Sequence, residues 1–224
     1  MSEEKKDPTF SSRKHTGEAQ KNLTGNINPK CPTALVIIDM INDLNFPDNE
    51  YIVEQGKKIA ENILKLRRKA KENGLPVIFC NDNWGSWTSD VTSIIDHCTK
   101  SKHPGSEMSK LFKNEEDEYF VIKPKHSAFF STTLDVLLQH LQIKTLILVG
   151  VAGNICVLFT ANDAYMRDFA LIVPKDCIAS NSEELNNQAL GLMESVLKAK
   201  VDSSDQIKWK DICEKCTSDK KITD

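Results

Sequence analysis

Short apolar runs alternate with charged, amphipathic segments along most of this chain. Each apolar run has the length of a strand, and each charged segment can place its apolar residues on one face of a helix. This alternation predicts a parallel β-sheet that is buried on both faces. The expected strands cover residues 34–40, 76–81, 119–123, 145–151 and 170–174, with a short last strand near Val201, and the expected helices cover 50–73, 132–141, 154–168 and 182–199. The polar stretch between 81 and 119 is expected to be mainly loop.

Capping residues mark three of the expected helix ends. Asn73 and Gly74 form a C-cap pair, and Ser182 is followed by two glutamates, which are favourable in the first turn of a helix. Asn154 is a candidate cap for the helix that follows strand 145–151. These signals divide the chain into a polar N-terminal arm or disordered lead (1–30), one folded domain (31–208) and a polar C-terminal tail (209–224).

The composition is that of a single globular domain and excludes several classes of protein. The chain has 224 residues, of which 40% are hydrophobic and 27% charged, with a formal net charge of −3. Its apolar runs are far shorter than the roughly 20 residues that a membrane-spanning helix needs. No basic face or aromatic-plus-arginine pattern suggests nucleic-acid binding. We therefore expect neither a membrane nor a nucleic acid as a partner.

The seven cysteines form an odd set, and no secretory apolar segment precedes them. Reduced thiols in a cytoplasmic protein are the simplest interpretation, so no structural disulfide is expected. Cys213 and Cys216 form a CxxC pair in the polar tail. Without a second such pair or a histidine motif, we interpret it as incidental rather than as a zinc site.

Three residues whose side chains are capable of catalysis lie at the ends of expected strands. In open α/β sheets, ligands bind outside the carboxyl ends of the strands, where Asp39, Lys123 and Cys156 are placed. Each residue alone has a structural explanation: Asp39 as a helix cap, Lys123 as an exposed strand end and Cys156 as a core thiol. Their joint placement on one edge of the sheet favours a catalytic site, with Cys156 at a helix N-terminus that lowers a thiol pKa.

Three segments together resemble the isochorismatase-like cysteine hydrolase superfamily, which includes enzymes similar to nicotinamidase and N-carbamoylsarcosine amidohydrolase. They read LVIIDMINDL at 35–44, VIKPKHSAF at 121–129 and GVAGNICV at 150–157, and the resemblance covers about residues 32 to 204. It implies a Rossmann-like, three-layer α/β/α fold with about six mainly parallel strands. It also implies an Asp39–Lys123–Cys156 catalytic triad and a cis peptide between Val151 and Ala152.

A triad of this kind has a coherent chemistry. Lys123 and the helix N-terminus are expected to lower the pKa of Cys156, and Asp39 would take the thiol proton as general base. The thiolate would attack a planar carbonyl carbon, release ammonia or an amine, and leave a thioester that water hydrolyses. Backbone N–H groups near Ala152 and Cys156 are candidates for the oxyanion hole.

The segment CNDNWGSW at 80–87 departs from relatives that resemble nicotinamidase, which often have an Asp-Trp-His type of metal motif there. No histidine is available at this point, and neither His97 nor His103 has a clear partner. Because a catalytic metal site needs about three protein ligands, we expect no metal and no cofactor, and Asp82 alone is weak evidence for one.

Aromatic side chains are the candidates for the substrate pocket. Trp84 and Trp87 are interpreted as a possible lid over a planar substrate, with a core edge or a subunit interface as the alternative. Phe129 is a candidate pocket wall, and His126 is left out of the catalytic set as a structural hydrogen-bonding residue.

The sequence thus predicts a cytoplasmic hydrolase of small-molecule amide or ureido C–N bonds, and by resemblance to relatives a homo-oligomer, either a dimer or a tetramer. Isochorismatases that cleave a vinyl ether resemble this chain but lack the nucleophilic cysteine, so Cys156 favours amide hydrolysis. The alternatives are vinyl-ether hydrolysis, a catalytically silent binding protein on the same fold, and a thiol-redox protein that uses Cys156 with Cys177.

Overall fold

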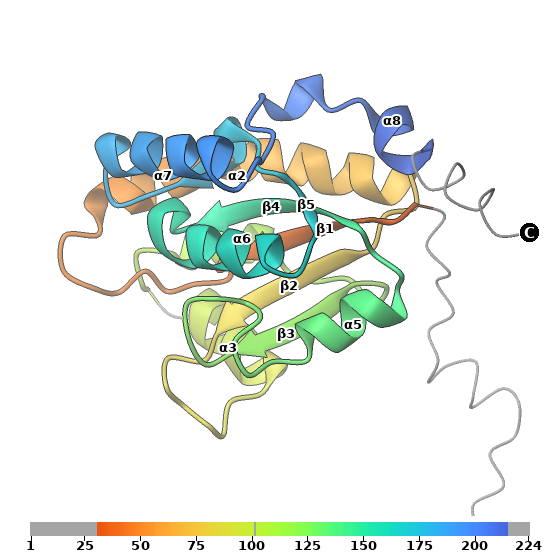
Figure 1. Ribbon diagram of the computed structural model, residues 1–224. Helices are drawn as coiled ribbons and strands as arrows, with labels where there is room; N and C mark the ends of the chain where they lie inside the picture. The colour runs from red at the N-terminus through yellow and green to blue at the C-terminus, as the bar shows by residue number, and fades with distance from the viewer. Residues whose placement is uncertain (1–30, 101, 215–224) are drawn as a thin grey trace, which may run out of the picture.

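The computed structural model describes residues 31–100 and 102–214. At its centre lies a six-stranded sheet with the order β3-β2-β1-β4-β5, in which β6 also pairs with β4 and every pairing is parallel (Figure 1). The strands are β1 (Thr33–Ile38), β2 (Val77–Asp82), β3 (Tyr119–Lys123), β4 (Thr145–Val151), β5 (Ala170–Ile172) and β6 (Ile178–Ala179). The predicted six-stranded parallel sheet is therefore confirmed.

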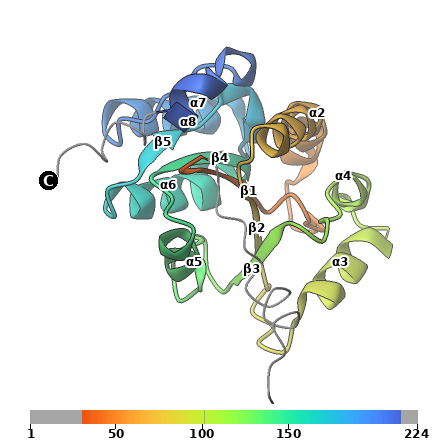
Figure 2. The same ribbon diagram turned by 90° about the vertical axis from the view of Figure 1, so that its right-hand side faces the viewer.

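Helices cover both faces of this sheet (Figure 2). One face carries α2 (Glu50–Glu72), α3 (Val91–Lys100), α4 (Ser106–Leu111) and α8 (Trp209–Glu214), and the other carries α5 (Leu134–His140), α6 (Leu158–Tyr165) and α7 (Glu183–Ser195). Short helical turns are η1 (Gly153–Val157), η2 (Lys175–Cys177) and η3 (Ser204–Gln206). Every residue of β1 is buried, and from Ala34 to Ile38 alternate side chains enter the two cores, which explains why the sequence after Thr33 is apolar. No helix in the described ranges is long and apolar enough to cross a membrane.

The capping signals at two helices are confirmed. Helix α2 ends at Asn73, whose side-chain Nδ2 donates to the carbonyl of Lys69 at 2.8 Å, and Gly74 follows with a φ of +72°. Helix α7 begins after Ser182, whose hydroxyl accepts a hydrogen bond from the backbone N–H of Leu185 at 3.2 Å.

Two expectations about the elements are wrong. The stretch expected to be loop contains α3 and α4, and the apolar residues Ile94 and Cys98 of α3 are buried. A reciprocal cap begins α3: the Asp90 carboxylate accepts from the N–H of Ser93, and the Ser93 hydroxyl accepts from the N–H of Asp90. Near Val201 the chain makes only an isolated bridge between Lys200 and Ile172, and β6 is the sixth strand.

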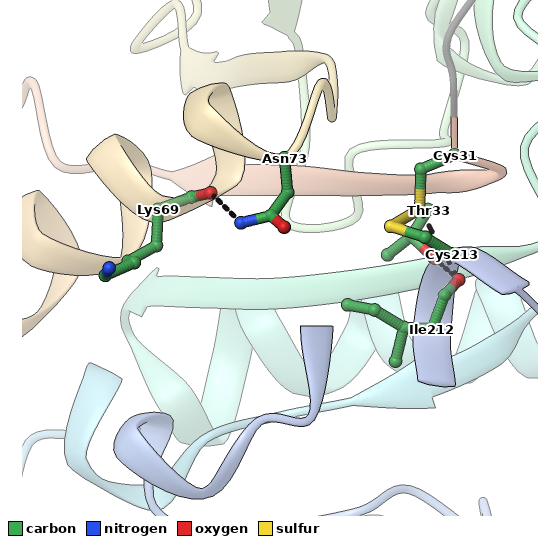
Figure 3. Close-up of a disulfide and its surroundings, with 6 residues drawn as sticks. All are labelled: Cys31, Thr33, Lys69, Asn73, Ile212 and Cys213. Atoms are coloured by element: carbon green, nitrogen blue, oxygen red, sulfur yellow. Dashed lines mark hydrogen bonds between the residues drawn. A yellow bond between two sulfur atoms is a disulfide. The ribbon is translucent and has the colours of Figure 1, made fainter. Parts of the chain in front are cut away.

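The C-terminal segment 209–214 also differs from the expected polar tail. It forms α8, and a disulfide joins Cys213 to Cys31 just before β1 (Figure 3). The Thr33 hydroxyl donates to the carbonyl of Ile212 at 3.0 Å, while Trp209 and Ile212 pack against the core. The expectation of no disulfide is therefore wrong, because folding brings together two cysteines that lie 182 residues apart. This disulfide removes the reason to expect only reduced thiols, and Cys216 lies outside the described residues.

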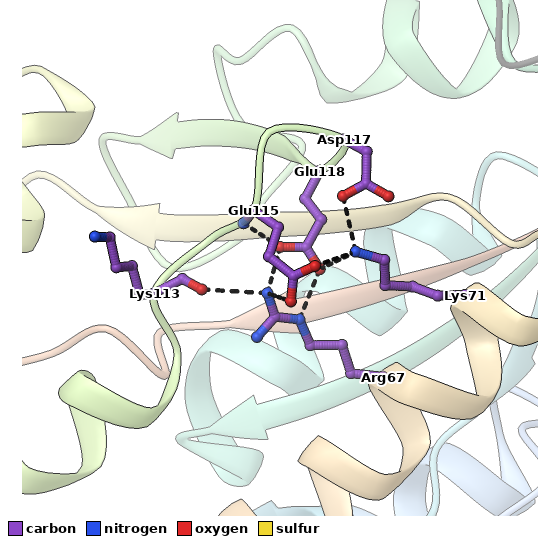
Figure 4. Close-up of polar contacts among 6 residues, drawn as sticks. All are labelled: Arg67, Lys71, Lys113, Glu115, Asp117 and Glu118. Atoms are coloured by element: carbon purple, nitrogen blue, oxygen red, sulfur yellow. Dashed lines mark hydrogen bonds and ion pairs between the residues drawn. The ribbon is translucent and has the colours of Figure 1, made fainter.

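A buried ion pair joins α2 to the loop before β3 (Figure 4). The guanidinium of Arg67 donates to both carboxylate oxygens of Glu118, at 2.6 and 2.5 Å, and to the carbonyl of Lys113 at 3.2 Å. The side chains of Arg67 and Glu118 are 8% and 1% exposed, whereas the neighbouring Glu115 is 60% exposed. Separating these two buried charges would cost folding free energy, because each would be left without its partner. The pair therefore fixes the start of β3, and with it the position of Lys123 at the end of that strand.

We expect Glu118→Gln to lower the free energy of unfolding by about 3 kcal/mol, because it removes the buried countercharge of Arg67 and leaves only the exposed Glu115 carboxylate, 3.3 Å away. The matched control Glu115→Gln should cost less than about 1 kcal/mol, because its carboxylate is exposed to solvent. Urea unfolding of both variants measures the difference. Equal costs would contradict the assignment of Glu118 as the buried partner.

Cys213→Ser should lower the free energy of unfolding by about 2 to 4 kcal/mol, because it removes a cross-link that restricts the unfolded chain. Cys216→Ser is the matched control and should leave stability unchanged. Urea unfolding without reductant, compared between the two variants, tests this expectation. A Cys213→Ser protein as stable as the unsubstituted chain would show that the cross-link contributes nothing.

Candidate active site

The candidate site lies at the carboxyl ends of the central strands. Strand β1 pairs with β2 on one side and with β4 on the other. Strands β2 and β3 extend the sheet on one side of β1, and β4 and β5 extend it on the other, so the strand order reverses at β1. In open α/β folds, a crevice forms outside the strand ends at such a switch point. Asp39 directly follows β1, Lys123 ends β3, and Cys156 lies in the turn after β4. The three predicted catalytic residues therefore come from strands on both sides of the switch point.

The ammonium group of Lys123 brings these residues together. Its Nζ lies 2.9 Å from Oδ2 of Asp39 and 3.5 Å from Sγ of Cys156. It also lies 3.4 Å from Oδ2 of Asp82 and 3.3 Å from the carbonyl oxygen of Lys125. Lys123 is fully buried and Asp39 is 3% exposed. The alternative of Lys123 as an exposed strand end is therefore wrong, since its side chain is buried against these acceptors.

Backbone contacts from β2 fix the orientation of Asp39. Its N–H donates to the carbonyl of Cys80 at 3.0 Å, and its Oδ1 accepts from the N–H of Asp82 at 2.8 Å. The residue adopts a φ of +50°, in the left-handed region that aspartate tolerates better than most residues. This turn leaves Oδ2 directed at Lys123, as the distance between them shows.

Cys156 is held in η1, a single π-helical turn that continues into α6. The peptide bond between Val151 and Ala152, which precedes this turn, is cis. The Ser180 hydroxyl accepts from the N–H of Asn154 at 3.0 Å and donates to Oδ1 of Asn186 at 2.8 Å. A Cβ at position 153 would lie 2.7 Å from the same hydroxyl, so glycine is needed for this close approach.

The expected N-cap by Asn154 does not form. No side-chain cap is made at the start of η1, and within the described chain the Oδ1 of Asn154 is buried without a hydrogen-bond partner. The backbone of this turn is held instead by Ser180. The Thr160 hydroxyl also holds this turn: it donates to the carbonyl of Cys156 at 2.7 Å and accepts from the N–H of Ala128 at 3.0 Å. Thr160 thus ties the nucleophile turn to the loop that follows Lys123.

The structure separates the aromatic residues expected in the pocket. Trp84 lines a hollow of about 490 Å³ beside the strand ends, together with Asp43, Asn83 and His97. Trp87 does not line it and is 83% exposed. Phe129 is buried in the core, with the Arg167 guanidinium 4.8 Å from its ring centroid, so the expected pocket wall is core.

The interpretation of His126 as a structural hydrogen-bonding residue outside the catalytic set stays a prediction. The ring centroid of His126 is 5.7 Å from that of Phe159, and the side chain is exposed. Cys177, the other thiol of the redox alternative, is buried and free, and burial raises its pKa to about 12. Such a thiol is poorly reactive, which weakens the redox alternative.

Sequence reasoning missed a polar cluster at the edge of the same hollow. The side chains of Asp43, His97 and His103 place their oxygen and nitrogen atoms within 4.8 Å of one another. His97 Nε2 lies 3.0 Å from Oδ2 of Asp43, so the expectation that this histidine lacks a partner is wrong. His97 lies on α3 and His103 lies just after it, in a stretch that the sequence analysis interprets as loop. Without an expected helix there, the sequence does not indicate that the two side chains lie close together.

Comparison with known proteins identifies the family of this chain. A model of the isochorismatase domain matches residues 33–205. The chain belongs to the isochorismatase family. The uncharacterized isochorismatase family protein YaaI of Bacillus subtilis (strain 168) is 47% identical over 178 residues, which are 80% of this chain and 97% of that protein.

Solved structures of other members share the fold. The structure of N-carbamoylsarcosine amidase from Thermoplasma acidophilum is 28% identical, with a TM-score of 0.62 over 79% of this chain and 98% of that one. Pyrazinamidase/nicotinamidase from Streptococcus mutans UA159 is also 28% identical, with a TM-score of 0.59 over 75% of this chain and 99% of that one. Two amidase structures are thus similar to this isochorismatase-family chain over most of its length.

In this family member, the pKa of the Cys156 thiol lies well above its ordinary value. Burial is the largest cause and the negative charge of Asp39 adds to it, while the Lys123 ammonium acts in the opposite direction without overcoming them. For Lys123, burial lowers the pKa, but Asp39, Cys156 and Asp82 together raise it above its ordinary value. The expected lowering of the Cys156 pKa is therefore wrong, and the resting site holds a thiol beside an ammonium.

The ultraviolet absorbance of the thiolate, followed against pH, tests this protonation state. The difference between the unsubstituted protein and Cys156→Ser should show no Cys156 thiolate at neutral pH. Asp39→Asn should lower the midpoint by about one pH unit or more, because it removes a negative neighbour and leaves Lys123 in place. A thiolate already present at pH 7 in the unsubstituted protein would contradict this account.

Proposed function

We propose that this protein hydrolyses amide or ureido C–N bonds of small molecules, with Cys156 as nucleophile, Asp39 as general base and Lys123 as electrostatic support. The observation that carries the proposal is the position of the buried Lys123 ammonium, 2.9 Å from Asp39 and 3.5 Å from Cys156. A buried lysine that contacts both a carboxylate and a free thiol at a sheet switch point is an arrangement suited to nucleophilic catalysis.

The first half of the reaction forms a thioester. Because the thiol is protonated at rest, Asp39 takes its proton as Sγ attacks the carbonyl carbon of the substrate. Lys123 stabilises the negative charge that develops among sulfur, carboxylate and substrate oxygen. Protonated Asp39 then gives the proton to the leaving nitrogen, the C–N bond breaks, and ammonia or an amine departs.

The second half restores the enzyme. Asp39 takes a proton from water, the resulting hydroxide attacks the thioester carbon, and the C–S bond breaks. The proton on Asp39 returns to the departing Cys156 sulfur, and the product leaves as a carboxylic or carbamic acid that loses its proton to solvent. The backbone N–H groups of Ala152, which precedes η1, and of Cys156, which lies within it, are our candidates for binding the oxyanion in both halves, with Val151 preceding Ala152.

The substrate class follows from the nucleophile and from similar proteins. A thiolate forms a thioester with amide or ureido carbonyl carbon, whereas a vinyl ether offers no acyl carbon for it to attack. The two solved relatives at 28% identity are described as amidases of a carbamoyl compound and of nicotinamide or pyrazinamide. Assembly as a homo-oligomer and residence in the cytoplasm stay predictions from the sequence.

We expect Cys156→Ala and Asp39→Asn each to lower kcat/KM by at least about 10³-fold, because residues that act as one catalytic unit are each needed. Ammonia release from nicotinamide, N-carbamoyl amines and ureido acids is the assay. Cys177→Ala, which removes a different buried free thiol, should retain turnover. Full activity of Cys156→Ala would refute the mechanism, and a panel without any turnover would favour the catalytically silent alternative.

A further inference from the structure

The cluster of Asp43, His97 and His103 combines one carboxylate with two imidazoles at the edge of the 490 Å³ hollow. Asp43 is partly buried and His97 is exposed, with side-chain exposures of 15% and 48%. The ring centroids of His97 and His103 are 4.9 Å apart, and the ring centroids of His97 and Trp84 are 5.5 Å apart. Three potential ligands from two separate segments thus converge beside the candidate active site.

The fold builds this convergence with specific backbone contacts. The N–H of Gly105 donates to the carbonyl of Asp43 at 2.8 Å, and a Cβ at position 105 would collide with the carbonyl of Asn42. The Ser109 hydroxyl donates to the carbonyl of Asn42 and accepts from its N–H, both at 2.9 Å. The loop after β1 is therefore clamped against the turn between α3 and α4, and this clamp holds Asp43 next to His103.

We propose that Asp43, His97 and His103 bind a divalent transition-metal ion, with Zn²⁺ as the reference ion. Two imidazole nitrogens and one carboxylate oxygen form a ligand set that such ions favour. A tetrahedral ion with bonds of about 2.0 to 2.2 Å needs ligand atoms about 3.3 to 3.6 Å apart, so the side chains need to move by about 1 Å. Since His97 and His103 are not deeply buried, rotation about their side-chain bonds supplies this movement.

The proposed site leaves at least one coordination position for a water or a polar group of a small molecule. Asp43 and His97 line the hollow together with Asn83 and Trp84, so that position is accessible from it. The site does not use the segment after β2. There, Asp82 contacts Lys123 at 3.4 Å and position 84 is a tryptophan rather than a histidine. Metal binding at this site is independent of the proposed hydrolysis and can be measured directly.

The test uses the full-length, disulfide-bonded chain after removal of metal with a chelator and dialysis. Calorimetric titration with Zn²⁺ should give one ion per chain, and Co²⁺ should give a visible spectrum of nitrogen and oxygen ligands without sulfur charge transfer. His97→Ala and His103→Ala should each weaken Zn²⁺ binding by at least about tenfold. Circular dichroism confirms that each variant is folded.

Two control variants make the outcome decisive. His140→Ala removes an exposed histidine of α5 outside the cluster and should leave binding unchanged. Cys216→Ser removes the thiol of the CxxC pair and should also leave it unchanged. The proposal is overturned by a protein that binds no Zn²⁺ at micromolar concentrations, by binding that persists in His97→Ala and His103→Ala, or by binding that disappears in Cys216→Ser.

Discussion

The structure of the site depends on one buried cation. An ammonium group removed from water costs several kcal/mol unless anions and hydrogen-bond acceptors surround it. Lys123 meets this requirement with Asp39, Asp82 and the carbonyl of Lys125. Each of these groups lies at or just beyond the carboxyl end of a strand, so the parallel sheet itself collects the acceptors. Cys156 is the remaining neighbour of the ammonium, and it enters from β4 on the other side of β1.

The same balance of charges explains the state of the thiol. Two carboxylates already contact a single ammonium, so a thiolate at Cys156 would add a further negative charge to a largely desolvated site. In the mechanism that we propose, the thiol therefore keeps its proton until a substrate carbonyl is present to take up the charge. In the proposed mechanism Asp39 is a general base that acts during the attack, rather than a residue that merely orients a preformed thiolate.

Much of this arrangement is encoded locally and could be predicted. The uninterrupted apolar runs that end at Asp39 and Lys123 identify buried parallel strands, and strand ends in such sheets meet at one edge. The sequence alone therefore predicts that Asp39, Lys123 and Cys156 lie together at this edge. Helix α3 was missed because only Ile94 and Cys98 of its ten residues are buried, which is too few to give a clear helical period.

Features that depend on contacts between distant segments could not be predicted. Cys31 and Cys213 lie at opposite ends of the described chain, and only the packing of α8 beside β1 joins them. Asp43 meets His97 and His103 because Gly105 permits a close backbone approach, which no local pattern reveals. The direction of the Cys156 pKa shift depends on how the effects of burial and Asp39 compare with that of Lys123, and the sequence does not show how deeply this thiol is buried.

Covalent capture of the acyl-enzyme tests the central claim most directly. The unsubstituted protein is mixed with an amide or ureido substrate that it turns over, quenched in acid during turnover, and examined by intact-mass and peptide-mass spectrometry. The account predicts a mass increase equal to the acyl group, located on the peptide that contains Cys156 and absent from Cys156→Ala. An acyl group on any other residue, or turnover without a covalent species on Cys156, would contradict it.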